Sequence, residues 1–195
     1  ARLRDEKGLL THAGILFDSK FSSYHSLDQL ITSSDTNLSP EGPVVAVTGA
    51  LQWMRRGDFL KHPFNTSYNV CGEDVELCID FQQYLNKQVW LCNQATAIHE
   101  PETTRSQQAD QGQNSEDLLR LRIRAQSFIE QATADQLRLL LYRQQLESQQ
   151  LRDLINNKSP KENEREQEQE RILFELREDR LKLKQEIELL QGGLK

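Results

Sequence analysis

Hydrophobic positions in the first half of the chain fall into short runs separated by polar turns, a pattern typical of short strands in a mixed fold. Residues 9–17 form an apolar segment with one interruption, which predicts two short strands or one strand with a bulge. Residues 44–47 are continuously apolar, as expected of a strand that is buried on both faces. Further strands are predicted at residues 89–92 and 96–99.

Two helices and one long loop are predicted between these strands. Residues 72–85 place an apolar face on one side of a helix that opens with acidic residues. Residues 50–60 predict a short helix whose Trp53 we expect in the core rather than as a stacking platform for a sugar ring. Residues 19–43 are polar and predict a long loop with one turn of helix near residues 27–31.

The pattern changes after residue 106. Residues 107–113 are rich in Gln, and the following Asn-Ser-Glu-Asp is a helix-start signal for a helix that runs to about residue 156. Its apolar positions recur at spacings of three and four: Leu118, Leu121, Ala125, Phe128, Ala132, Leu139, Tyr142 and Leu146. This stripe must be covered by the first half of the chain, by the next helix or by another chain.

The last segment is highly charged and carries a short heptad pattern. Its candidate core positions are Leu173, Leu176, Leu183, Ile187 and Leu190. So few heptads are marginal for an isolated coiled coil, so two interpretations stay open. One is an antiparallel hairpin with the preceding helix, and the other is weak self-association.

These observations divide the chain into four segments. Residues 1–106 contain ten of the thirteen aromatic residues and all three cysteines, so the composition that forms a core belongs there. A linker at residues 107–114 follows. The long amphipathic helix occupies residues 115–157, and the charged helix with the coiled-coil pattern occupies residues 158–195.

Composition and charge exclude several classes of function. The net charge is −6 with no basic block, which argues against a nucleic-acid partner. No run approaches the roughly 20 apolar residues of a membrane span, so we expect no transmembrane segment. With no signal-peptide pattern either, a cytoplasmic location is predicted.

The cysteines and histidines do not indicate a metal centre of their own. Cys71, Cys78 and Cys92 are odd in number and lack a Cys-x-x-Cys unit, so neither a zinc site nor a disulfide framework is indicated. Cys78 and Cys92 are expected as buried thiols, whereas Cys71 is expected to be more exposed. The four histidines show no His-x-x-x-His pair, which disfavours a metal hydrolase.

The most informative motif is Gly72-Glu73-Asp74 at the start of a predicted helix. Acidic residues in a first helical turn are common because free N–H groups and the helix dipole favour them, so capping alone is one interpretation. The other is catalytic: a carboxylate held firmly at the rim of a sheet can act as a general base. Only geometry separates the two.

Several ordered blocks within residues 1–106 resemble the C-terminal half of a family 2 glycosyltransferase. They comprise residues 8–17, residues 44–56, Phe59, Phe64, the Gly-Glu-Asp-Val-Glu-Leu-Cys block at 72–78 and the His-Glu-Pro-Glu-Thr-Thr-Arg block at 99–105. The resemblance implies an α/β fold: part of a GT-A (nucleotide-diphospho-sugar transferase) domain, followed here by long α-helices with coiled-coil character. It also implies transfer of a sugar, with inversion at the anomeric carbon, from a nucleotide diphosphate donor to a hydroxyl of a glycan or other acceptor.

The resemblance assigns roles residue by residue. Asp74 matches the catalytic base that removes the acceptor hydroxyl proton, and Glu73 beside it matches a residue that orients the acceptor. Thr48, Gly49 and Ala50 match a segment that lines the substrate site, and Gly72 belongs to the same substrate-binding group. An ordinary strand-to-helix turn is the alternative interpretation of the segment at residues 48–50.

Two further residues are assigned to the metal and the diphosphate. His99 matches a histidine that approaches the metal in related enzymes, where Mn or Mg is the expected divalent ion, and a simple strand-end histidine is the alternative. Arg105 could face phosphate oxygens through its planar donor fork, although a lone arginine is more often a surface residue.

The donor half of such an enzyme has no counterpart in this sequence. GT-A enzymes carry a nucleotide-binding βαβ half that closes with an Asp-x-Asp metal motif, and no Asp-x-Asp occurs here. We therefore expect a fragment that is inactive alone. The alternative hypothesis is a noncatalytic interaction or scaffold protein, in which a degenerate GT-A half supports the long helices.

Overall fold

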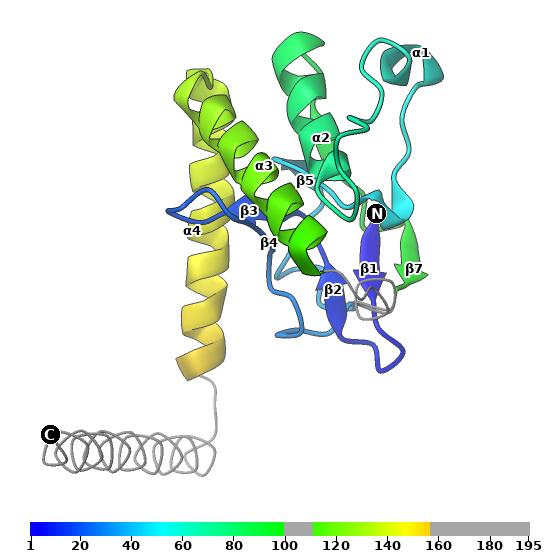
Figure 1. The fold of residues 1–195 in the computed structure, drawn as a ribbon. Helices are drawn as coiled ribbons and strands as arrows, with labels where there is room; N and C mark the ends of the chain where they lie inside the picture. Colours follow the sequence, from blue (N-terminus) through cyan, green and yellow to red (C-terminus); the bar gives the residue numbers. More distant parts are fainter. Residues whose placement is uncertain (100–110, 157–195) are drawn as a thin grey trace, which may run out of the picture. The chain divides into compact units, whose positions relative to one another are not determined.

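The computed structural model describes residues 1–99 and 111–156 (Figure 1). Its internal contacts divide the chain into two compact units, residues 1–150 and 151–195. The fold of the first unit is mixed α/β, with small sheets and helices. The predicted coiled-coil pattern at residues 158–195 lies outside the described residues, as does Arg105.

Three small sheets make up the β-structure of the described residues. The largest contains β1 (Arg2–Arg4), β2 (Leu10–His12) and β7 (Thr96–Ile98) in the order β2-β1-β7. Strand β1 pairs antiparallel with β2 and parallel with β7. The other two sheets are antiparallel pairs: β3 (Ile15–Phe17) with β4 (Ser23–His25), and β5 (Gly42–Val44) with β6 (Val89–Leu91).

Four α-helices and one 3₁₀ turn occupy the described residues. They are the 3₁₀ turn Gly49–Leu51, α1 (Arg56–Phe59), α2 (Glu73–Tyr84), α3 (Gln111–Glu130) and α4 (Ala134–Asn156). The core consists mainly of strand and α2 side chains, among them Leu3, Leu10, Phe17, Val45, Ala46, Ile79 and Leu91. None of these helices is long and apolar enough to cross a membrane.

Helix α3 packs alongside α2 and covers its own apolar stripe there (Figure 1). Leu121, Ala125 and Phe128 are each at most 3% exposed. At the same interface the Arg124 guanidinium pairs with the Asp80 carboxylate at 2.7 Å. The sequence left open whether the first half of the chain, the next helix or another chain covers the stripe. For this part of it, the first half of the chain does so.

Helix α4 is attached to the strands by polar side chains that reach backbone groups in distant loops. The Arg143 guanidinium donates to the Pro43 carbonyl at 2.8 Å and the Pro40 carbonyl at 3.0 Å. The Glu147 carboxylate accepts from the Tyr24 hydroxyl at 2.8 Å and the Leu27 N–H at 3.1 Å. Three of these partners are backbone groups, one of them in strand β5, and the fourth is the Tyr24 hydroxyl on strand β4.

The predicted linker and continuous helix are wrong at two places: α3 already begins at Gln111, within the predicted linker, and the helix is interrupted between α3 and α4. Thr133 begins α4 as a capping box: its hydroxyl accepts from the Gln136 N–H, and the Gln136 side chain accepts from the Thr133 N–H at 2.8 Å. This Thr-x-x-Gln signal is readable in the sequence. The apolar spacing that runs across it concealed the break.

Other expectations in the first half also differ from the structure. The predicted helical turn near residues 27–31 is absent, because Leu27 and Gln29 have φ of 56° and 58°, which a right-handed helix does not allow. The same polar segment contributes strand β4 instead of only loop. Trp53, expected in the core, is 89% exposed. Cys71, expected to be exposed, is buried against α3, and Cys92 is only partly buried.

Replacing Arg143 with methionine should lower the free energy of unfolding by about 2–4 kcal/mol, because two carbonyl groups lose a charged donor. Chemical denaturation measures this change. Arg138→Met on the same helix is the matched control, since Arg138 is 77% exposed and bonds only within its own helix. Equal effects from the two substitutions would show that α4 is not attached through Arg143.

Candidate functional site

All the candidate residues except Arg105, which lies outside the described residues, line one cleft of about 300 Å³. They come from three segments: the 3₁₀ turn after Thr48, the start of α2 with the loop before it, and His99 directly after β7. The cleft lining comprises Thr48, Gly49, Ala50, Gly72, Glu73, Asp74 and His99, together with Ile15, Ser23, His25, Val70, Cys71, Val75, Leu118 and Leu121.

Asp74 is held at the junction of two of these segments. One carboxylate oxygen accepts from the Gly49 N–H at 2.5 Å, and the other accepts from the Val75 N–H at 2.7 Å. A Cβ at Gly49 would lie 3.1 Å from the Asp74 Cβ, so the two backbones approach closely because residue 49 has no side chain. The carboxylate is therefore oriented by two backbone N–H groups, one from each segment.

Thr48 is connected to a buried histidine behind the cleft. Its N–H donates to His12 Nε2 at 3.3 Å, and the other ring nitrogen of His12 lies 3.2 Å from His25 Nδ1. His12 is 1% exposed. Burial, reinforced by the nearby His25, holds the pKa of His12 well below its ordinary value of 6.5. A neutral ring suits this position, because an unprotonated Nε2 is what accepts the Thr48 N–H.

Gly72 allows the chain to turn from the loop into α2. It is the N-cap of that helix, with φ 106° and ψ −15°, in the left-handed region where glycine is favoured. A Cβ at this position would lie 2.9 Å from the Tyr68 ring and 3.3 Å from a methyl carbon of Leu121. Glycine is thus required both by the backbone conformation and by the close packing of α3 against the turn.

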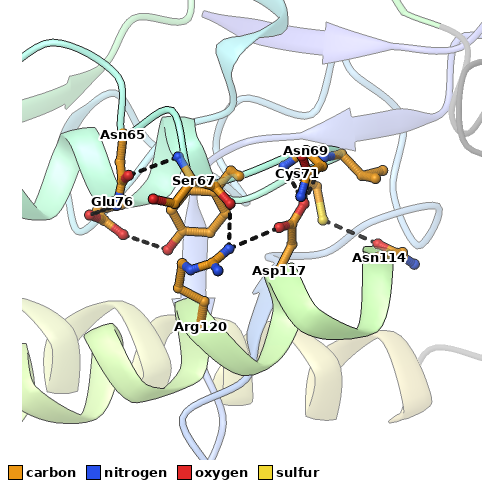
Figure 2. A network of polar contacts seen from close by, with 10 residues as sticks. Asn65, Ser67, Asn69, Cys71, Glu76, Asn114, Asp117 and Arg120 are labelled. Atoms are coloured by element: carbon orange, nitrogen blue, oxygen red, sulfur yellow. Dashed lines mark hydrogen bonds and ion pairs between the residues drawn. The ribbon is translucent and has the colours of Figure 1, made fainter. Parts of the chain in front are cut away.

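The third acidic residue of the first turn, Glu76, faces away from Asp74 and holds the preceding loop. Its carboxylate accepts from the Asn65 side chain at 2.9 Å and from the Tyr68 hydroxyl (Figure 2). Burial and the neighbouring Glu76 raise the pKa of Tyr68 above its ordinary value, so the phenol stays protonated as a donor. Glu76 is therefore a loop-anchoring residue.

The described residues do not form a metal centre by themselves. His99 is exposed at the rim of the cleft, and no group of three or more His, Cys, Asp or Glu among residues 1–99 and 111–156 is arranged to hold a metal ion. Leu118 and Leu121 also line the cleft, although sequence reasoning treated them only as part of a stripe. Their helical spacing indicated burial but not what they would face.

A larger apolar groove of about 460 Å³ lies on the other side of the turn at residues 48–51. Its walls include Val47, Leu51 and Leu77, together with Trp53 and Trp90, which are 89% and 52% exposed. The turn and α2 contribute to the cleft and to the groove alike. Neighbouring residues of these two segments point to opposite sides, so some line the cleft and others line the groove. Exposed tryptophans at a groove are typical of binding surfaces.

No protein-family model, curated protein or solved structure matches this chain. The resemblance to family 2 glycosyltransferases therefore stays a prediction from the residues quoted above. What the arrangement can do is judged from its geometry: an oriented carboxylate, backbone N–H groups and an imidazole share one open cleft.

Gly72→Ala should lower the free energy of unfolding by about 2–4 kcal/mol, because it adds left-handed strain and a clash with Tyr68. Gly57→Ala is the control: Gly57 lies within α1 with open space around its Cβ position, so alanine should be neutral or slightly stabilising. Thermal or urea denaturation compares the two. A tolerated alanine at residue 72 would contradict the described entry into α2.

His12 should make the fold less stable in mild acid. Its pKa is lowered in the folded protein, so below about pH 6.5 the unfolded chain binds more protons and the free energy of unfolding falls. Between pH 7.5 and 5.5 this group should contribute a loss of about 1 kcal/mol, which His12→Gln should remove. Urea denaturation at both pH values measures it, with His62→Gln as control, because His62 is not among the groups that lower the pKa of His12. An unchanged pH dependence in His12→Gln would contradict the buried neutral ring.

Proposed function

We propose that this chain carries the acceptor-activating half of a nucleotide-sugar glycosyltransferase, with Asp74 as its general base. The observation that supports the proposal most strongly is the convergence of the 3₁₀ turn, the start of α2 and His99 on one cleft. These segments are more than 20 residues apart in sequence, and the resemblance assigns them to the substrate-binding, catalytic and metal-binding parts of one site.

In the proposed reaction the Asp74 carboxylate accepts the proton of the acceptor hydroxyl. The hydroxyl oxygen forms a bond to the anomeric carbon of the donor sugar, while the bond from that carbon to the nucleotide diphosphate breaks and its electron pair leaves with the diphosphate. The Gly49 and Val75 N–H groups support this role, because together they fix both carboxylate oxygens, and each oxygen keeps a second lone pair that can accept from the acceptor hydroxyl.

Glu73 and the residues at 48–50 would hold the acceptor beside that base. Glu73 follows Gly72 and lines the same cleft as Thr48 and Ala50, so a polyhydroxylated acceptor would meet polar groups from both segments. A divalent metal ion would neutralise the leaving diphosphate in such an enzyme. The described residues do not complete a metal site, so no step of the proposal uses one.

The apolar groove favours a second candidate function, a noncatalytic interaction protein. Trp53, Leu51 and Trp90 are large apolar side chains that are 89%, 41% and 52% exposed on one surface. Surfaces of this kind commonly bind another protein or an apolar ligand. This candidate requires the groove and does not require the Asp74 carboxylate.

Asp74→Asn in the full-length protein should lower kcat by about a hundredfold or more with little change in KM for the donor, because only proton removal is lost. The assay measures sugar transfer from a panel of UDP-, GDP- and dTDP-linked hexoses. Asp135→Asn is the matched control, since that carboxylate is 89% exposed and paired within α4. Undiminished turnover would exclude Asp74 as the base. No transfer from any donor, even when the chain is supplied together with the donor-binding half that the proposal requires, would favour the interaction protein.

A further inference from the structure

Asp117 of α3 is a fully buried carboxylate that contacts the loop leading into α2. It is 0% exposed, and one of its oxygens accepts from three consecutive backbone N–H groups: Asn69 at 2.9 Å, Val70 at 2.6 Å and Cys71 at 3.2 Å (Figure 2). The residues so joined are 46 to 48 positions apart in sequence.

Three successive N–H groups that point at one position form a concave anion-binding site in many proteins. Here the anion belongs to the chain itself. Burying a carboxylate is costly unless charge-assisted hydrogen bonds compensate for the lost water, and three N–H donors with a cation provide them. Because each bond depends on the same loop conformation, the carboxylate selects one backbone path for residues 69–71.

Arg120, one helical turn further along α3, completes the arrangement. Its guanidinium contacts the second Asp117 oxygen at 3.2 Å and donates to the Ser67 carbonyl at 2.5 Å. It also lies over the Tyr68 ring, 5.4 Å from the ring centre. One turn of α3 therefore holds both the carbonyl side and the N–H side of the loop at residues 67–71.

This loop leads directly to the candidate base. Cys71 is followed by the left-handed Gly72, and Asp74 is the second residue of α2. The Leu121 side chain packs against the Gly72 position, so α3 fixes this entry at two adjacent points. A change in the path of residues 69–71 would shift the first turn of α2, which holds the Asp74 carboxylate against the Gly49 N–H.

We propose that Asp117 is a positioning residue for the candidate base: it holds residues 69–71 so that the Asp74 carboxylate reaches the Gly49 N–H. The inference rests on the proposed function for the role of Asp74. It assigns part of the site to α3, a helix outside the segment that resembles a glycosyltransferase. A buried Asp that only joined α3 to the loop would stabilise the fold without affecting the Asp74–Gly49 contact.

The test is an NMR comparison of variants of the full chain, and it needs no substrate. Asp74→Asn first shows how the Gly49 amide proton resonance changes when its carboxylate partner is replaced. Asp117→Asn should move the Gly49 resonance toward the value in Asp74→Asn and should reduce the exchange protection of the Val70 and Cys71 amides by about tenfold or more.

Asp80→Asn is the matched control, because it removes a carboxylate from the same α2–α3 interface but bonds to Arg124 and not to the loop. It should leave the Gly49 resonance in place. A Gly49 shift of the same size in Asp80→Asn, or no shift in a folded Asp117→Asn, would overturn the proposal. If Asp117→Asn does not fold, the unmodified protein provides the test. Val70 and Cys71 amides that are unprotected from exchange in the unmodified protein would likewise overturn the proposal.

The outcome is independent of catalysis. A Gly49 shift in Asp117→Asn supports the positioning role even when Asp74→Asn leaves sugar transfer unchanged, in which case only the proposed function fails. Conversely, loss of transfer in Asp74→Asn with an unmoved Gly49 resonance in Asp117→Asn would retain the base and reject its positioning by α3.

Discussion

The carboxylate of Asp117 occupies a position where water is excluded and three peptide N–H groups converge. Without that carboxylate, the N–H groups of residues 69–71 would lose their shared acceptor, and the Cys71 N–H among them is buried. Without the loop, a charge would be buried at high cost. Each requires the other, so α3 and the start of α2 form a single arrangement rather than a domain with a separate helix beside it.

Charged side chains of α4 likewise bond to groups far away in sequence, although here one is a cation and one an anion. A buried guanidinium from Arg143 reaches two carbonyl groups, and the Glu147 carboxylate reaches an N–H and a hydroxyl. The strands of this unit are only three residues long, and many of their flanking backbone groups have no partner strand. Long polar side chains from helices far along the sequence supply those partners.

Features that depend on residues close together in sequence were predictable, whereas contacts between distant residues were not. The bounds of α2 and the position of β7 were confirmed, because acidic first-turn residues and apolar spacing are local signals. The structure places residues 48–50, 72–74 and His99 along one cleft, while their roles stay a prediction. Asp117 was read as a helix-start acid, yet α3 begins at Gln111 and the carboxylate serves a loop far away in sequence. No local pattern identifies such a partner.

The candidate site exists only if the turn after Thr48 and the start of α2 meet in one cleft through Asp74. The most direct measurement is the nuclear Overhauser effect between the Gly49 amide proton and the Asp74 β-protons in the isotope-labelled full chain. The account predicts a strong cross-peak, because the Gly49 nitrogen lies 2.5 Å from the Asp74 carboxylate. If both resonances are assigned and the cross-peak is absent, the two segments do not meet. That result would contradict the candidate site.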